Sequence, residues 1–112
     1  MKIHNARIKN VTVGFDDRDR LSARMTFEGQ HGCFEWRFIL TNNTDVQRLI
    51  KLMNYARVHA VENLNGKIIR TVIYDRIFCA FGDPIEDKFV LAFDEELKDI
   101  TEAQLAEELL KT

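Results

Sequence analysis

Three residues of this chain have the types and order that magnesium-dependent nucleases use. Asp75 stands 11 residues before the run Glu86-Asp87-Lys88. Restriction-type nucleases place an Asp and a Glu-x-Lys across a hairpin, so that two carboxylates hold Mg²⁺ and the lysine faces the attacked phosphate. Here the local sequence predicts Asp75 in a turn, and Glu86 follows a Gly82-Asp83-Pro84 corner instead of lying within a strand. A magnesium-dependent nuclease is therefore the most distant alternative, and we predict no catalytic residue, no metal and no cofactor.

Cysteine and histidine offer a second kind of chemistry, but their spacing is poor. Cys33 and Cys79 are the only cysteines, and only His31 among the histidines lies near one of them. A zinc site normally needs four ligands at recognisable spacing. The spacing of Cys33 and Cys79 does not by itself establish a disulfide bond between them. We expect Cys79 to fill the core, and two cysteines without CxxC spacing suit a reducing compartment.

Four basic residues favour contact with phosphates. Alternation places Arg24 and Arg37 on the solvent face of a predicted sheet, and Arg7 and Lys9 lead into it. Arginines on a sheet can contact a nucleic-acid backbone. The aromatic residues of the third strand fall on the opposite face, so the stacking platform of RNA-binding sheets is not supported. The ordinary alternative is a solvated face with cross-strand ion pairs.

The acidic residues are concentrated at the end of the chain. The formal net charge is −2, yet the segment 94–112 has seven acidic residues against two lysines. A solvated helix face is the ordinary interpretation of such a run. The alternative is an acidic surface that meets a basic partner protein, and its contact residues would be Asp94, Glu95, Glu96 and Asp99. Tyr55, with its neighbours Arg57 and Val58, would add a small contact patch on a helix.

The elements that must position these side chains follow from periodicity. Alternating apolar residues predict strands over 10–15, 21–28 and 33–40, joined by polar turns into an antiparallel meander. The edges of such a sheet can pair with a partner or with a second copy, so a homodimer stays open. A β-branched run then predicts a hairpin over 67–81, and residues 88–93 resemble one more short strand.

One long helix is expected across the apolar face of the sheet. Thr44 and Gln47 have the spacing of a capping box at its start, and Asn65-Gly66 ends the apolar pattern. The predicted buried stripe is Val46, Leu49, Ile50, Met53, Ala56 and Ala60. Arg48, Lys51 and Tyr55 are placed nearer the opposite side. A second capping box, Thr101 to Gln104, predicts a short C-terminal helix that packs on the body, frays or serves a partner.

The chain resembles a family of small phage and prophage proteins of unknown function. Residues 8–17 are similar to a family opening I-K-N-V-S-L-G-F-E-D, residues 64–70 to L-x-G-K-x-x-R, and residues 80–89 to A-I-G-x-x-I-x-D-K-W. Relatives have a glycine-rich stretch where this chain has residues 33–37, and the acidic end has no counterpart in them. The resemblance implies no activity. It implies an accessory factor that binds a host macromolecule, as inhibitors of host defence such as anti-CRISPR proteins do.

These observations predict a single α+β domain over residues 1–112, with an acidic C-terminal segment at 94–112. Its fold would be an antiparallel sheet, a meander plus a hairpin, packed by one long helix and followed by a short one. The predicted core is Val11, Val13, Leu21, Met25, Phe27, Phe34, Trp36, Phe38, Leu49, Ile50, Met53, Ile69 and Phe81. No apolar run approaches the ~20 residues that span a membrane, and the first residues lack a secretory signal. We therefore expect a protein of the bacterial cytoplasm that binds a host protein, with nucleic-acid binding as the alternative.

Overall fold

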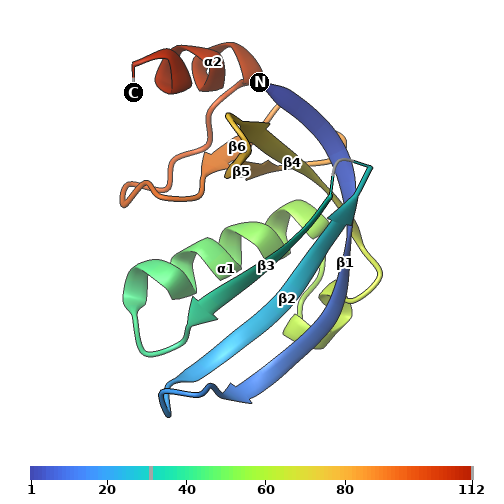
Figure 1. Cartoon of the computed structure of the whole chain (residues 1–112), viewed down its shortest axis with the longest axis vertical. Coiled ribbons are helices and arrows are strands. Elements are labelled where there is room, and N and C mark those ends of the chain that lie inside the picture. Colours follow the sequence, from blue (N-terminus) through green and yellow to red (C-terminus); the bar gives the residue numbers. More distant parts are fainter. Residues whose placement is uncertain (31, 112) are drawn as a thin grey trace.

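Six antiparallel strands form one curled sheet in the computed structural model, which describes residues 1–30 and 32–111. The strands are β1 (Lys2–Phe15), β2 (Leu21–Gly29), β3 (Gly32–Ile39), β4 (Ile68–Tyr74), β5 (Ile77–Gly82) and β6 (Phe89–Leu91). Their order in the sheet is β3-β2-β1-β4-β5-β6 (Figure 1). The α+β class is confirmed. The predicted meander and hairpin are two halves of one sheet.

The first strand joins these two halves. Residues 2–7 of β1 pair with β4, and most of residues 6–15 pair with β2. A bulge interrupts the second pairing at Asn10, whose φ of 57° lies in the left-handed region. The bulge shifts the alternation of the strand. Ile8 and Val13, which strict alternation would place on opposite faces, therefore both lie on the inner face. Ile8 is fully buried, whereas Val13 lies near the far end of the hairpin and is 55% exposed.

The helix α1 spans Asn43–Ala56 and is shorter than predicted. Its N-cap is Asn42, whose side-chain oxygen accepts a hydrogen bond from the backbone N–H of Asp45. The predicted capping box at Thr44 is therefore wrong by two residues. The helix ends because Arg57 takes a left-handed conformation with φ of 58°, well before the predicted stop. A short 3₁₀ helix, Val61–Leu64, follows it.

The buried side of α1 also differs from the predicted stripe. Leu49 and Ala56 are buried as expected, together with Leu52 and Tyr55, which were not assigned to that side. Ile50 is 43% exposed. Tyr55 is only 3% exposed, and its ring packs against Phe81 at a centroid distance of 6.1 Å.

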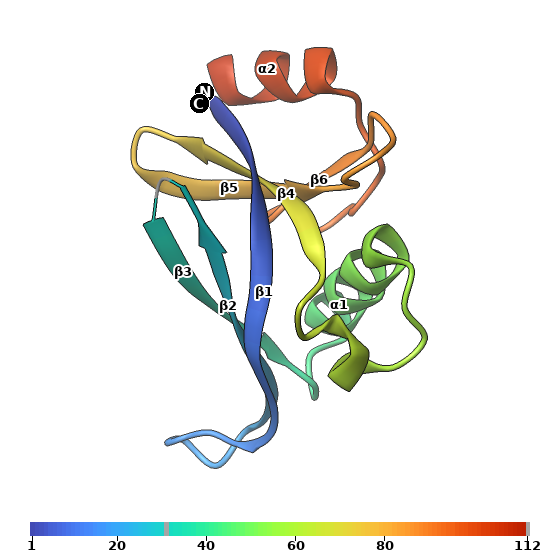
Figure 2. The ribbon, with the colours of Figure 1, turned by 90° about the vertical axis from the view of Figure 1, so that its right-hand side faces the viewer.

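Each face of the sheet has its own apolar core. The helix α1 lies inside the curl of the sheet and contacts β3, β4 and β5 (Figure 2). The core under α1 takes side chains from β1 to β6, with Phe38, Leu52 and Phe81 among the most buried. The second core, on the other face of β4 and β5, is smaller and includes Val72, Ala80 and Phe89.

Most of the predicted core residues are at least partly buried. The fully buried ones are Met25, Phe27, Phe38, Leu49, Ile69 and Phe81. The partly buried ones are Val11, Leu21, Phe34, Trp36 and Met53. Val13 and Ile50 are exposed, so their assignment to the core is wrong.

The acidic C-terminal segment is docked on the body. The helix α2 spans Glu102–Leu110, and its capping box between Thr101 and Gln104 is confirmed. Leu105 and Leu109 are buried against the second core. Before the helix, Ile100 exchanges two backbone hydrogen bonds with Phe89 of β6. Within the described residues, no helix is long and apolar enough to cross a membrane.

Candidate functional site

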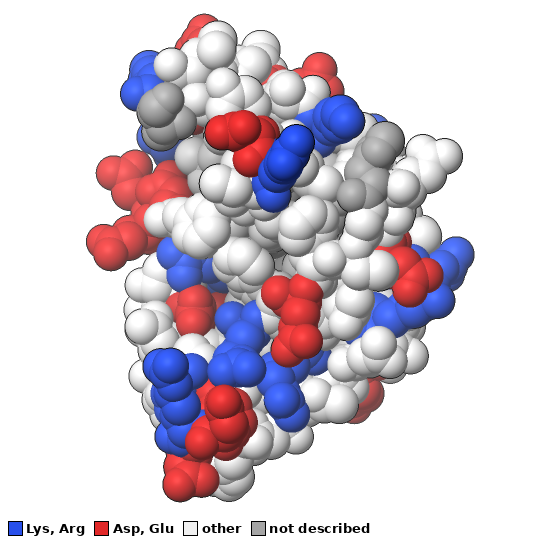
Figure 3. All heavy atoms as spheres, viewed as in Figure 1, with Lys and Arg blue, Asp and Glu red and all other residues white. Residues whose placement is uncertain are grey.

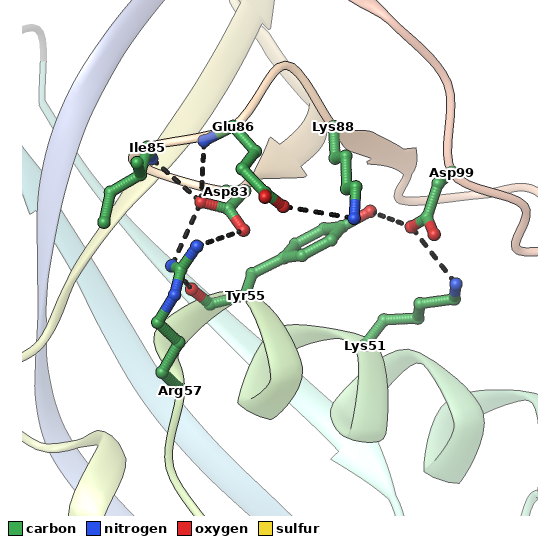
Figure 4. Close-up of polar contacts among 8 residues, drawn as sticks. All are labelled: Lys51, Tyr55, Arg57, Asp83, Ile85, Glu86, Lys88 and Asp99. Atoms are coloured by element: carbon green, nitrogen blue, oxygen red, sulfur yellow. Dashed lines mark hydrogen bonds and ion pairs between the residues drawn. The ribbon is translucent and has the colours of Figure 1, made fainter.

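A network of paired charges joins the end of α1 to the two loops that flank β6 (Figure 4). Its centre is Asp83, 3% exposed, in the corner after β5. The Asp83 carboxylate accepts hydrogen bonds from the backbone N–H groups of Ile85 and Glu86 at 2.8 and 3.0 Å. It also accepts two from the Arg57 guanidinium, both at 3.1 Å. Burial raises the pKa of Asp83, but these donors outweigh it and leave the pKa below its ordinary value of 3.8.

The second half of this network holds the acidic segment. The Tyr55 hydroxyl donates a hydrogen bond of 2.5 Å to the Asp99 carboxylate. The Lys51 ammonium lies 3.1 Å from the same oxygen. Burial raises the pKa of Asp99, while Tyr55 and Lys51 lower it, and the net shift is downward. Burial and the Asp99 carboxylate together raise the pKa of Tyr55 far above its ordinary value.

This network is suited to holding elements together, not to proton transfer. Tyr55 stays protonated at any physiological pH, and its proton already binds Asp99, so it is a poor general base. Lys88, the remaining cation, lies 3.1 Å from the Glu86 carboxylate. Each carboxylate of the network therefore has a cation beside it, as in a structural ion-pair cluster.

The predicted contact residues of the acidic segment divide into two groups. Glu95 and Glu96 are exposed on the loop after β6, where Figure 3 shows acidic side chains gathered at the edge of the molecule. Asp94 and Asp99 are anchors of that loop. The Arg48 guanidinium donates to the Asp94 backbone oxygen at 3.2 Å, and Asp99 binds Tyr55 and Lys51 as described. Tyr55 itself is buried, so the predicted contact patch on the helix does not include its ring.

The predicted basic face is largely paired with its own acidic residues. Arg37 lies 3.3 Å from Asp16, and Lys9 lies 3.0 Å from Glu28. Asp16 is 6% exposed. The hydrogen bond from the backbone N–H of Arg20 is the largest of the effects that lower the pKa of Asp16. Two other residues complete the set: Arg7 donates to the backbone oxygen of Gly66, and Arg24 lies directly opposite Arg37.

An apolar groove lies between β5 and α2. Its volume is about 560 Å³, and its apolar lining is Tyr74, Ile77, Cys79, Leu91, Phe93 and Leu109. Three acidic residues, Asp75, Asp94 and Glu108, complete the lining. Cys79 is half-buried there, and burial raises the pKa of its thiol, which makes it a poor nucleophile.

The described residues of the nuclease and zinc hypotheses are not brought together. Asp75 lines the groove, whereas Glu86 and Lys88 line a separate polar pocket beside Tyr55. Cys33 is exposed at the start of β3, and both cysteines are free. His31 lies outside the described residues. Among the residues that the structure describes, no group of three His, Cys, Asp or Glu side chains could hold a metal ion.

Sequence reasoning missed the pairing of Arg57 with Asp83 and the groove. A local signal for Asp83 exists, since an Asp before Pro84 commonly accepts backbone hydrogen bonds in a turn. Nothing in the sequence connects it to Arg57, because a contact between residues this far apart depends on the tertiary fold. Comparisons with family models, with curated proteins and with solved structures each returned no match to this chain.

Proposed function

We propose that this protein is a small non-enzymatic phage or prophage accessory protein that binds a host protein through the acidic loop between β6 and α2. An inhibitor of host defence, such as an anti-CRISPR protein, is one form that this activity can take. The observation that carries the proposal is the anchoring of the loop. Arg48 and Tyr55 hold its two ends by hydrogen bonds, and Glu95 and Glu96 between them remain exposed.

The anchoring matters because a fixed loop loses little conformational entropy when a partner binds. Carboxylates held at an edge attract a basic surface and repel phosphates, so they select a basic protein over nucleic acid. Contact at the edge of an interface contributes mainly to the association rate and to the salt dependence of binding.

The test is affinity capture from lysate of a bacterial host, with and without nuclease treatment. A host protein that is retained in stoichiometric amount after nuclease treatment supports the proposal. The variant Glu95→Lys/Glu96→Lys should reduce that retention by about 10-fold or more, because two favourable charges become repulsive. The matched control is Glu62→Lys/Glu107→Lys, which reverses two exposed charges outside the loop. Equal losses in both variants would reject the loop as the contact surface.

Nucleic-acid binding through the sheet face is the second candidate. Arg24 and Arg37 face each other across β2 and β3, and Arg24 has no ion-pair partner among the described residues. A binder of this kind should lose affinity steeply as salt rises, and Arg24→Glu should weaken it. It ranks second because Arg37 is already paired with the buried carboxylate of Asp16.

A further inference from the structure

The groove between β5 and α2 is the part of the second core that α2 leaves open. Leu105 and Leu109 of α2 are buried on this core. The strand residues next to them, Tyr74, Cys79 and Leu91, are only partly buried. A helix with so narrow an apolar stripe cannot cover all of the apolar side chains that β4, β5 and β6 present on this face.

Two large apolar side chains of the groove are exposed. Ile77 is 55% exposed and Phe93 is 68% exposed. The ring of Phe93 also packs edge-on against the ring of Trp36, at a centroid distance of 5.6 Å, and this contact helps to hold Phe93 in place. Contiguous exposed apolar residues with a polar border are typical of surfaces that bind other proteins.

The border of this groove has one sign of charge. Asp75, Asp94 and Glu108 line it, and none of its described lining residues is basic. Lys111 lies 3.5 Å from Glu108, but both side chains are exposed, so this pair neutralises little of the field. In Figure 3 the acidic loop after β6 and the β4–β5 turn lie on the same face of the molecule.

We infer that the groove binds a basic amphipathic segment of the partner protein. Apolar side chains of that segment enter the groove beside Ile77 and Phe93, and its lysines or arginines meet the three carboxylates. A volume of about 560 Å³ lies within the range of pockets that enclose a small ligand, so it accommodates a bulky side chain. The inference rests on the proposed function, because it names the chemistry of the partner that the neighbouring acidic loop attracts.

The probe for this inference is a fluorescein-labelled peptide of about 14 residues with leucines and lysines in a helical amphipathic repeat. Two companions replace all lysines by glutamates or all leucines by serines. Fluorescence anisotropy with the full chain should show binding of the first peptide and at least about 10-fold weaker binding of the two others. Backbone amide signals of residues 74–79 and 108–109 should shift in NMR spectra on addition of the first peptide.

Matched variants locate the binding to the groove. Ile77→Ser should weaken binding of the first peptide about 10-fold. The control Ile85→Ser changes an isoleucine outside the groove that is even more exposed, 73% against 55%, and it should not weaken binding. Glu108→Gln should weaken it about threefold and reduce its salt dependence, whereas Glu107→Gln should not. Circular dichroism of each variant confirms that the fold is retained.

Three results would overturn the inference. In the first, the three peptides bind equally. In the second, Ile77→Ser and Ile85→Ser bind the first peptide alike. In the third, the wild-type chain self-associates in sedimentation experiments and Ile77→Ser abolishes that association, so a second copy occupies the groove.

Failure of the groove inference can be distinguished from failure of the proposed function. If a captured host protein is lost from Glu95→Lys/Glu96→Lys but kept by Ile77→Ser, the groove inference fails and the proposed function stands. If no host protein is captured but the peptide binds the groove, the proposed function fails and the groove inference stands.

Discussion

The two faces of the sheet are covered to different extents. The face under α1 meets a helix of 14 residues that buries four side chains and is tied down by Arg57 and Tyr55. The face under α2 meets a helix of 9 residues that buries Leu105 and Leu109. The first face is covered by its own chain except near the end of the β1–β2 hairpin, whereas the second leaves the apolar side chains of Ile77 and Phe93 exposed. The difference indicates that stability comes chiefly from the first face and binding capacity from the second.

The largest expected effect is in the first core. Leu52→Ala should lower the free energy of unfolding by about 3 kcal/mol, because a fully buried leucine leaves a cavity that its neighbours cannot fill. Urea denaturation followed by circular dichroism measures the change. Ile50→Ala, two residues away on the exposed side of the same helix, is the control. A loss as large as that of Leu52→Ala would show that the helix faces the sheet as the sequence pattern predicted.

A smaller effect is expected in the second core. Leu105→Ala should cost about 2 kcal/mol, since α2 is short and can relax into the space. Hydrogen exchange should show faster opening of α2 while the amides of β1 stay protected. The control is Leu110→Ala, on the same helix but 76% exposed. If Leu105→Ala unfolds both faces together, the two cores are one cooperative unit and the contrast between them fails.

The attachments of α1 should also respond to acid. The pKa values of Asp83 and Asp99 are lowered in the folded chain, so their stabilisation is fully present above the ordinary carboxyl value of 3.8. It is lost as the pH falls through the lower folded values. Asp83→Asn should cost about 1 to 2 kcal/mol at neutral pH. Its stability should then fall less steeply than that of the wild type when the pH is lowered below about 4, and parallel acid titrations would contradict this assignment.

The smallest effect is expected from one hydroxyl group. Tyr55→Phe removes the donor to Asp99 and should cost about 1 kcal/mol, because Lys51 still pairs with that carboxylate. Thermal unfolding measures the difference. The control, Tyr74→Phe, changes a tyrosine of the open face and should leave stability within about 0.5 kcal/mol. Equal effects would mean that the hydroxyl contributes nothing to the closure of the first face.

The strands could be predicted from the sequence better than the sites. Strict alternation identified β2 and the buried residues Met25 and Phe27, because one face of that strand meets the core and the other meets solvent. The same alternation placed Val13 on the inner face but could not show that it is exposed, because the protruding end of a hairpin leaves no trace in a period of two. The helix stripe failed at Tyr55 because a tyrosine whose hydroxyl finds a carboxylate can be buried as well as a leucine.

The candidate sites could be predicted only in part. Composition located the acidic segment, and Glu95 and Glu96 are exposed as a contact surface requires. Composition could not show that the Asp99 carboxylate accepts a hydrogen bond from Tyr55, because that contact exists only in the folded chain, where α1 and the loop meet. The groove was not predictable for the same reason. Its lining comes from β4, β5, β6 and α2 together.

The position of β1 has a consequence for the order in which the chain folds. Strand β1 is synthesised before β2 to β6, yet it is a central strand of the sheet. Its Lys2 pairs with Ile73, far along the chain. Strands β1 to β3 can form a meander during synthesis, but one edge of β1 stays unpaired until β4 has been made. Closing so long a loop slows folding. During that interval the exposed edge invites pairing with other nascent chains, and chaperones that shield strand edges should raise the yield of native protein.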